Sequence, residues 1–315
     1  MLLSIVIPIF NGEKTISACI SSIVNQSIND NYEIIIINDG STDNTLQIIQ
    51  DYQLKYKNIL IVNQPNKGLS YSRNIGLKKA RGEWIWFVDG DDEIHFHSLY
   101  KILDILKKNE TLDIINFNFK VGNYIEKHYC CYQNIYGNAI ELFTKLPIFN
   151  VVWNKIYKKE FLLNNHLTFT AGILCEDIEF NIRAFIKANQ ILFSPTFIYT
   201  YKWYPNSLCH SIEKQNKIID GFIYSLTHVN EICKSHPQYL AKASFILITY
   251  INQLLRDINK NKRKEYLQNM SGIKLTHLRF SISIPYVVSR LFSISPKLCY
   301  QLQTIRSKFT QLLRR

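Results

Sequence analysis

The sequence lacks the features that would place the chain outside the ordinary globular class. None of its apolar stretches reaches the roughly 18 uncharged residues that a membrane span needs, and no low-complexity tract interrupts its 315 residues. Residues 1–10 are apolar, but they lack the basic start and the small-residue cleavage site of a secretory signal. Since 47% of the residues are hydrophobic and 20% are charged, the chain can bury a core in one or two domains.

The cysteines do not have the number or spacing of a disulfide framework or a zinc site. The chain has 7 cysteines, an odd number, and no Cys-x-x-Cys pair with zinc spacing. We therefore expect buried free thiols and a reducing, cytoplasmic location. His95-Phe96-His97 does not predict a zinc site either, because no further ligand set follows it; the position is typical of the entry to a helix.

Acidic residues are scarce toward the C-terminus. The net charge is +12, and residues 251–315 hold 13 basic residues against 2 acidic ones, which gives +11. The first hundred residues hold 8 basic and 11 acidic residues, which gives −3. Residues 297–315 also place apolar residues at helical spacing, namely Leu298, Leu302, Ile305, Phe309 and Leu312. Such a basic amphipathic helix predicts contact with an anionic membrane face, with packing on the rest of the chain as the alternative. No nucleic-acid-binding motif is present.

Short apolar runs alternate with helical patterns along the first hundred residues. We expect strands at 2–10, 32–38, 58–63 and 84–88, and helices at 13–24, after 43 and at 70–80. This alternation predicts an α/β fold with a largely parallel sheet covered by helices on both faces. A further strand at 113–120, a helix at 176–188 and a helical region from about 212 follow.

Polar clusters stand at the ends of three predicted strands, at residues 8–11, 39–43 and 89–92. Ligands of open α/β sheets bind at the carboxyl ends of the strands, so we expect the three clusters to share one edge. In Asp89-Gly90-Asp91-Asp92, two carboxylates at i and i+2 can hold a hard divalent cation, and an acidic turn is the alternative. A phosphatase nucleophile loop does not fit, because Glu93 occupies the place of its usual Thr or Val.

The other two segments have local structural explanations too. Ser41 or Thr42 can cap a helix, with Asp43 favouring its dipole, although this leaves Asp39 unexplained. Gly68 permits an unusual backbone angle before a helix whose N-terminus favours anions, and Arg73 adds a cation there.

Four segments taken together resemble the family 2 glycosyltransferases of the GT-A fold, a Rossmann-like and mostly parallel mixed sheet flanked by helices. They are residues 4–11 (SIVIPIFN), 37–43 (INDGSTD), 66–76 (NKGLSYSRNIG) and 87–92 (FVDGDD). Their order and spacing match the family. The resemblance covers residues 1–95 closely and 96–210 loosely, and does not cover the tail.

The resemblance implies a nucleotide-sugar donor, usually a UDP-sugar, and a divalent metal, Mn or Mg. It implies that Asp39 reads the uracil, that Asp89 lies near the ribose and the metal, and that Asp91 binds the metal. The other implied donor-site residues are Pro8, Phe10, Asn11, Glu13, Asn66, Gly68, Gly90 and Arg73, with Arg73 close to Asp39 and Asp89. A metal has a physical reason as well, because charge grows on the leaving diphosphate as the sugar bond breaks.

An inverting transfer also needs one general base for the acceptor hydroxyl. The family places it in a Glu-Asp pair that opens a helix, and residues 173–180 (ILCEDIEF) match. The match implies Asp177 as the base and Glu176 as an acceptor-positioning residue; two acids that favour a helix N-terminus are the alternative.

Two further segments concern the acceptor and the metal. Residues 152–157 (VWNKIY) resemble the Trp-Asn-Lys segment of capsule and lipooligosaccharide transferases in this family. Trp153 would stack on a sugar, and Asn154 or Lys155 would contact acceptor or phosphate; a core tryptophan with a solvated lysine is the alternative. His210 is predicted as a third metal ligand or pyrophosphate contact, with a surface-loop histidine as the alternative.

The prediction is an inverting hexosyl- or N-acetylhexosaminyltransferase that acts on a surface glycan or lipid-linked acceptor at the inner face of the cell membrane. We expect a catalytic domain at 1–210, with a nucleotide-binding half at 1–95 and an acceptor half at 96–210, and a helical region at 211–315. An inactive relative that binds glycan or nucleotide is one alternative, but the presence of Asp89, Asp91 and Asp177 argues against it. A sugar nucleotidyltransferase is another alternative. Such an enzyme needs a basic glycine-rich loop, and residues 11–14 (NGEK) match that loop poorly.

Overall fold

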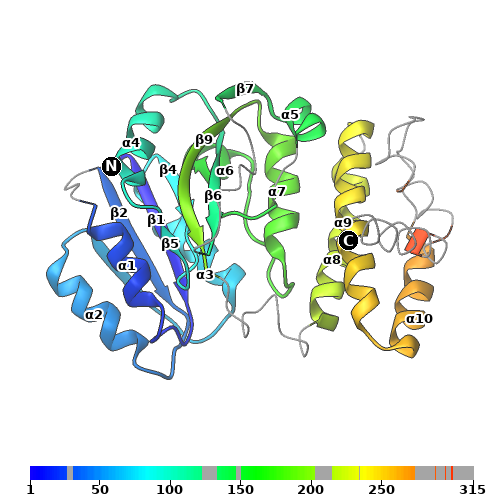
Figure 1. The fold of residues 1–315 in the computed structure, drawn as a ribbon, viewed down its shortest axis with the longest axis horizontal. Coiled ribbons are helices and arrows are strands. Elements are labelled where there is room, and N and C mark those ends of the chain that lie inside the picture. Colours follow the sequence, from blue (N-terminus) through cyan, green and yellow to red (C-terminus); the bar gives the residue numbers. More distant parts are fainter. Residues whose placement is uncertain are drawn as a thin grey trace, which may run out of the picture. The chain divides into compact units, whose positions relative to one another are not determined.

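The computed structural model describes residues 1–26, 31–122, 133–146, 150–202, 215–233 and 235–273, with a few isolated residues beyond them. The chain divides into two compact units. The sheet unit comprises Met1–Gly172 and Glu176–Tyr204, and the helical unit comprises Ile173–Cys175 and Pro205–Arg315 (Figure 1). The predicted boundary between residues 210 and 211 lies outside the described residues and stays a prediction.

The first half of the sheet unit is a parallel sheet with a helix after each of its first three strands. Its strands lie in the order β3-β2-β1-β4. They are β1 (Leu3–Ile9), β2 (Tyr32–Asn38), β3 (Ile59–Asn63) and β4 (Trp84–Phe87), and the helices are α1 (Ile16–Val24), α2 (Thr45–Lys55) and α3 (Leu69–Lys79). Every residue of β1 and β2 is buried, as expected for continuous apolar strands covered on both faces.

Alternate residues of β1 show which helices cover which face. Ile5 and Ile7 share a core cluster with Ile16 and Ile20 of α1. Val6 points the other way, because successive side chains of a strand alternate, and it packs directly on Gly76 of α3. Helices α1 and α3 therefore cover opposite faces of the sheet.

The second half of the sheet unit makes the sheet mixed. Strand β8 joins the edge of β4 in antiparallel orientation, β6 follows it, and β9 lies parallel to β6. The two short strands β5 and β7 pair with β9 in antiparallel orientation. The strands are β5 (Glu93–Ile94), β6 (Ile114–Val121), β7 (Ile135–Asn138), β8 (Lys155–Lys158) and β9 (Gln190–Tyr201), and the helices are α4 (Ser98–Lys108), α5 (Ala139–Lys145), α6 (Lys159–Asn164) and α7 (Glu176–Lys187). The predicted α/β fold, a mixed sheet flanked by helices, is confirmed.

The helical unit contains α8 (Gln215–Ile232), α9 (Pro237–Asp257), α10 (Lys260–Asn269) and a short 3-10 helix at Met270–Gly272, as the helical region after residue 212 predicted. The guanidinium of Arg263 donates hydrogen bonds to the carbonyl oxygens of Leu255, Arg256 and Ile258, which closes the end of α9. None of the helices in the described part of the chain combines the length and the apolar character that a bilayer crossing requires. Apart from Cys299 and Tyr300, residues 297–315 lie outside the described residues.

Candidate functional site

The loops that follow β1 and β2 are joined by hydrogen bonds between backbone and side chains. The backbone N of Asn11 donates to Ser41 Oγ at 3.0 Å, and the N of Thr42 donates to Asn11 Oδ1 at 2.8 Å. One turn further on, the N of Glu13 donates to Asp43 Oδ2 at 3.1 Å. Two of the three predicted polar clusters therefore share one edge of the sheet.

The local capping of α2 differs from the expectation. The helix begins at Thr45, whereas a cap at Ser41 or Thr42 would start it at residue 42 or 43. Asp43 Oδ1 instead accepts a hydrogen bond from the backbone N of Thr45 at 3.0 Å. Ser41 and Thr42 instead bind the loop that follows β1, and the side chain of Asn44, the N-cap residue, makes no capping hydrogen bond.

The third cluster lies against the same edge. Gly90 packs so closely on the end of β1 that an added Cβ would lie 2.6 Å from Ile9 Cδ1 and 3.3 Å from the carbonyl oxygen of Pro8. A Cβ here would displace the end of the Ile9 side chain and crowd the Pro8 carbonyl, so glycine favours the close approach of the acidic loop to β1. Phe10, the next residue along, has a side chain that is 49% exposed. The three clusters meet, as the sequence predicted.

Asp39 is buried and holds the loop that precedes α3. Its Oδ1 accepts hydrogen bonds from Gln64 Nε2 at 2.8 Å and from the backbone N of Lys67 at 2.9 Å, and its Oδ2 accepts one from the N of Gly68 at 2.8 Å. Gly68 adopts a φ of 89°, which favours glycine. A carboxylate has about four acceptor positions, so three bonds leave room for one more. Asn66 and Gly68 are exposed beside it.

Arg73 connects the acidic loop to the start of α7. Its side chain is 1% exposed, and its Nη2 lies 2.7 Å from Asp89 Oδ1. Its Nη1 lies 2.5 Å from Glu176 Oε1 and 2.5 Å from Asp177 Oδ1. The predicted closeness to Asp89 is therefore found. The hydrogen bonds of Asp39 within the described residues go to the α3 loop instead of Arg73, because that loop offers two backbone donors.

The aromatic ring of Phe169 and a pair of backbone contacts fix this arrangement. The guanidinium carbon of Arg73 lies 5.2 Å from the centre of the Phe169 ring. The side-chain amide of Asn74 exchanges two hydrogen bonds with the backbone N and O of Phe169, at 2.8 and 2.9 Å. The segment that leads into α7 is thereby pinned to α3. No sequence signal linked residues this far apart.

Burial and charge shift the pKa values of this cluster. Burial lowers the pKa of Arg73, but Asp177, Asp89 and Glu176 outweigh it and raise the pKa above its usual range. Burial raises the pKa of Glu176 to about 8, against the opposing effect of Arg73 and with a further rise from Asp177. Burial also raises the pKa of Asp89, again opposed by Arg73. Burial therefore favours the protonated form of Glu176, and the three acidic neighbours favour the charged form of Arg73.

Asp91 and Asp92 follow in the same loop with different surroundings. Burial, with the charge of Asp89, raises the pKa of Asp91 to about 6. Within the described part of the chain, the Asp91 carboxylate accepts no hydrogen bond from another residue. Asp92 is fully enclosed and accepts hydrogen bonds from Tyr199 and from the backbone of Lys202. Asp91 is the partly exposed carboxylate of the loop, and Asp92 anchors it.

Trp153, Asn154 and Lys155, for which acceptor contacts are predicted, are all buried in the structure. Trp153 is 6% exposed, and its ring stacks on Tyr199 and Tyr201 with centroid distances of 4.5 and 5.8 Å. Lys155 Nζ is buried and donates to Asn154 Oδ1 at 2.8 Å and to the carbonyl of Val151 at 2.7 Å. The core alternative holds for the tryptophan, and the lysine is also inside because carbonyl and amide oxygens solvate its charge.

Asp177 is placed by two hydrogen bonds from opposite sides. Its Oδ1 accepts from Arg73, and its Oδ2 accepts from the backbone N of Val152 at 3.1 Å. Glu176 is buried at the start of α7, whereas Asp177 is partly exposed. Of the pair, Asp177 is the acid that a ligand can reach.

The carboxylates of Asp89 and Asp91 are suitable ligands for a hard cation, although they are few in number. Among the described residues, no group of three or more His, Cys, Asp or Glu side chains is placed to hold a metal ion. His210, the predicted third ligand, lies outside the described residues. The Asp91 carboxylate and Asp89 Oδ2, the oxygen that does not contact Arg73, lie in the loop after β4. Carboxylate oxygens are the ligands that Mg²⁺ and Mn²⁺ prefer, together with substrate phosphates and water. The residues present fit such an ion.

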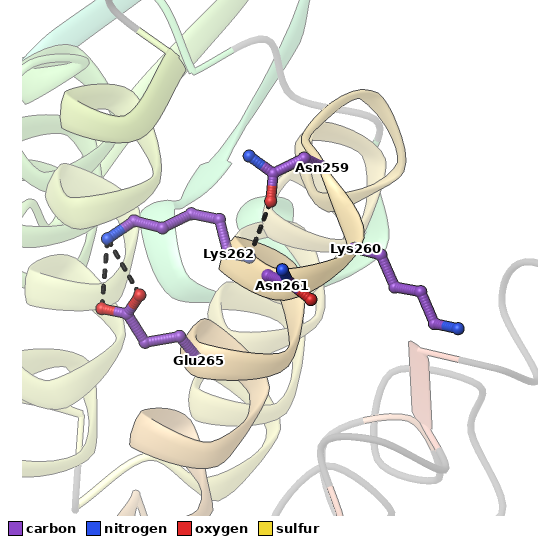
Figure 2. Close-up of a pocket in the computed structure, with 5 residues that line it drawn as sticks. All are labelled: Asn259, Lys260, Asn261, Lys262 and Glu265. Carbon is purple, nitrogen blue, oxygen red and sulfur yellow. Dashed lines mark hydrogen bonds and ion pairs between the residues drawn. The ribbon is translucent and has the colours of Figure 1, made fainter.

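A separate pocket on the helical unit does not show comparable chemistry. Asn259, Lys260, Asn261, Lys262 and Glu265 line it (Figure 2). Asn259 Oδ1 accepts from the backbone N of Lys262 at 2.9 Å, and Lys262 Nζ lies 3.1 Å from both Glu265 oxygens. In Figure 2 the side chain of Lys260 points away from this pair. Asn259, Lys262 and Glu265 therefore bind one another instead of converging on a ligand.

Comparisons with known proteins show which family the first half of the chain resembles. The family model described as glycosyl transferase family 2 matches residues 4–163. The uncharacterized glycosyltransferase EpsJ of Bacillus subtilis is 33% identical over 218 residues, which cover 66% of this chain and 62% of the relative. The chain therefore spans less than two thirds of that relative's length.

Two solved structures share the fold. The structure of Staphylococcus aureus TarS residues 1–349 in complex with UDP-GlcNAc matches with a TM-score of 0.76 and 19% identity, covering 99% of this chain and 92% of that one. The mannosyltransferase PcManGT from Pyrobaculum calidifontis, in complex with GDP-Man and Mn²⁺, matches with a TM-score of 0.54 and 12% identity, covering 97% and 87%. At these identities the likeness concerns the fold alone.

Proposed function

Because the chain belongs to glycosyl transferase family 2, we propose that it is an inverting glycosyltransferase that moves a sugar from a nucleoside-diphosphate sugar to a hydroxyl group. One observation carries the proposal. Arg73 joins Asp89, in the loop at the strand ends, to the acidic pair Glu176–Asp177 on α7. Arg73 thus holds Asp89, a candidate metal ligand, and Asp177, a candidate general base, around one buried cation. A sugar transfer of this kind needs both groups close together.

The nucleotide is proposed to bind where the loops after β1 and β2 meet. Asp39 has one acceptor position left for a base, and the exposed ring of Phe10 offers a stacking surface beside Asn11. Glu13, Asn66 and Gly68 lie in the adjoining loops, and Pro8 lies near the end of β1. TarS, which has a similar fold, was solved with UDP-GlcNAc, so a UDP-sugar is the first donor to test.

Asp91, with Asp89 beside it, is proposed to hold Mn²⁺ or Mg²⁺. When bound, such an ion stabilises the negative charge that grows on the leaving diphosphate. Asp91 suits this position because its carboxylate has no other partner among the described residues, whereas Asp92 is fully engaged. PcManGT, a more distant structural neighbour, was solved with Mn²⁺.

Asp177 is proposed to be the general base. The acceptor oxygen attacks the anomeric carbon, the bond from that carbon to the phosphate oxygen breaks, and the hydroxyl proton passes to an Asp177 oxygen. Arg73 and the N of Val152 fix the direction of this carboxylate. Burial raises the pKa of Glu176, so Asp89 and Asp177 are the partners that favour the charge of Arg73 most strongly. The role of Glu176 is to position the pair, and contact with the acceptor is not part of the proposal because Glu176 is buried.

A nucleotide-binding relative without activity is the second candidate, and one experiment separates the two. The full chain is mixed with UDP-, GDP- and dTDP-sugars, with and without Mn²⁺, and its unfolding temperature is measured. We expect one donor to stabilise the protein only when Mn²⁺ is present, and Asp91→Asn to lose this effect. Hydrolysis or transfer of that donor distinguishes the enzyme from the binding protein, and stabilisation that is indifferent to Mn²⁺ contradicts the metal assignment.

The acceptor is proposed to be a surface glycan or a lipid-linked glycan at the inner face of the membrane. Support comes from the charge of the sequence, which concentrates +11 within residues 251–315. Removal of residues 297–315 should release the protein from vesicles that contain anionic lipid, while neutral vesicles bind neither form. Equal binding of the full and shortened chains to anionic vesicles would contradict a role of this segment.

A further inference from the structure

Asp92 ends the acidic loop and is buried more deeply than either neighbour in it. Its Oδ2 accepts a hydrogen bond from the Tyr199 hydroxyl at 2.8 Å, and its Oδ1 accepts one from the backbone N of Lys202 at 2.7 Å. Its own N donates to the carbonyl of Asp89 at 3.1 Å, which closes the turn. A buried carboxylate needs donors of this kind, so Asp92 is tied to β9 and the residue after it.

The Tyr199 hydroxyl contacts both ends of the loop. Besides donating to Asp92, it accepts a hydrogen bond from the backbone N of Asp89 at 3.1 Å. Just beyond the loop, β5 pairs with β9 in register, with Ile94 opposite Tyr199. Asp91 therefore lies in sequence between Asp89 and Asp92, and the Tyr199 hydroxyl binds both of these residues. Within the described chain, the Asp91 carboxylate itself accepts no hydrogen bond from another residue.

The Tyr199 ring has little freedom to turn. It is fully buried and stacks on Trp153, with centroids 4.5 Å apart and planes 12° from parallel. Trp86 meets it from the edge at 6.4 Å, and Trp86 Nε1 donates to the carbonyl of Trp153 at 2.7 Å. Trp153, which is predicted from the sequence to contact a sugar, thus supports the ring that anchors the loop.

We propose that the Tyr199 hydroxyl is a positioning group for the metal-binding carboxylates, with Trp153 holding its ring and Asp92 transmitting the contact. The proposal rests on the proposed function, in which Asp91 is a metal ligand. Ligands must be held within about 0.5 Å of their working geometry, and groups behind the ligands determine whether they are. Among the described residues, no other residue holds the Asp91 carboxylate by a hydrogen bond, so the two ends of its turn provide the support.

Tyr199→Phe removes the hydroxyl and keeps the ring. We expect the Mn²⁺ concentration for half-maximal UDP binding to rise about tenfold, within the range that loss of an outer-shell partner produces. Saturating Mn²⁺ should restore UDP binding, because the ligands remain present and only their placement is relaxed. Bound Mn²⁺ is counted from the loss of the free-ion paramagnetic resonance signal, which needs no turnover.

Tyr157→Phe is the matched control. Tyr157 lies on β8, is fully buried, and donates from its hydroxyl to Asn181 Oδ1 at 2.8 Å, away from the acidic loop. Both variants lose one buried hydroxyl, which takes part in two hydrogen bonds at Tyr199 and in one at Tyr157, so both should unfold at a somewhat lower temperature. Only Tyr199→Phe should need more Mn²⁺; an equal rise in both variants would overturn the proposal.

Asp92→Asn is measured alongside, so that the answer does not depend on one variant folding. The amide keeps the size but can accept from only one of the two donors, and the Mn²⁺ requirement should rise in the same direction. If the wild-type protein shows no Mn²⁺-dependent UDP binding, the proposed metal site fails and this inference with it. If the wild-type protein binds and both variants match it, this inference alone is overturned.

Discussion

Arg73→Met tests whether the buried cation holds the two halves of the site together. The change removes a guanidinium that is 1% exposed and lies within 2.7 Å of three carboxylates. Loss of one partner from a buried ion pair costs about 3–5 kcal/mol, because the charge left behind has no compensation. We expect the free energy of unfolding to fall by about this amount at pH 8.

The pH dependence of this loss supplies the sharper test. At pH 5 the carboxylates freed by the change, whose pKa values burial already raises for Asp89 and Glu176, take up protons in the folded state. Protonation removes the uncompensated charge, so the difference between variant and wild type should shrink as the pH falls. Urea unfolding is followed by tryptophan fluorescence, since Trp84, Trp86 and Trp153 lie in the sheet unit.

A surface pair provides the control for Arg73→Met. Lys145 and Glu141 form an exposed ion pair on α5, so Lys145→Met should change the stability by about 0.5 kcal/mol or less. A loss below about 1 kcal/mol for Arg73→Met at pH 8, on the scale of a surface pair, would refute the reasoning. An equal loss at pH 5 and pH 8 would refute the electrostatic part of it.

Three further predictions concern single residues. Asp177→Asn should lower transfer by about 10²–10⁴-fold and leave donor binding intact, as measured by steady-state kinetics and UDP titration; near-normal turnover removes it as the base. Burial raises the pKa of Glu176 from 4.5 to about 8, so its contribution to stability should be lost as the pH rises through that range, by about 1.4 kcal/mol per pKa unit at most. Glu176→Gln should flatten this part of the profile, and parallel wild-type and variant profiles would contradict it. Gly76→Ala should cost about 1–3 kcal/mol, because the new Cβ would overlap Val6, and adding Val6→Ala should recover part of the loss.

Local sequence patterns were sufficient for the parallel half of the sheet. The run YEIIIIN predicts β2 with the bounds that the structure has, because a strand buried on both faces is apolar throughout and ends where polar residues begin. The meeting of the clusters at Asn11, Asp39 and Asp89 followed from one rule about the carboxyl ends of parallel strands. These features depend on neighbours along the chain or on a regular topology.

The rest depends on contacts between distant residues. Arg73 and Asp177 are 104 positions apart, and no spacing links them. Trp153 and Lys155 matched a segment that suggested a sugar contact, but burial is decided by packing against β9, whose tyrosines cover the tryptophan ring. Tyr199 carried no signal at all, since a tyrosine in an apolar strand is ordinary until its hydroxyl partner is known.

The division of the chain has a consequence for modularity. Ile173–Cys175 belongs to the helical unit, where the backbone of Gly221 packs against the carbonyl of Leu174, and Glu176 returns to the sheet unit one peptide bond later. Truncation of the chain after residue 204 would therefore remove most of a unit to which Ile173–Cys175 also belong. A minimal fragment cut there would strip the packing partners from the three residues that lead directly into Glu176 and Asp177.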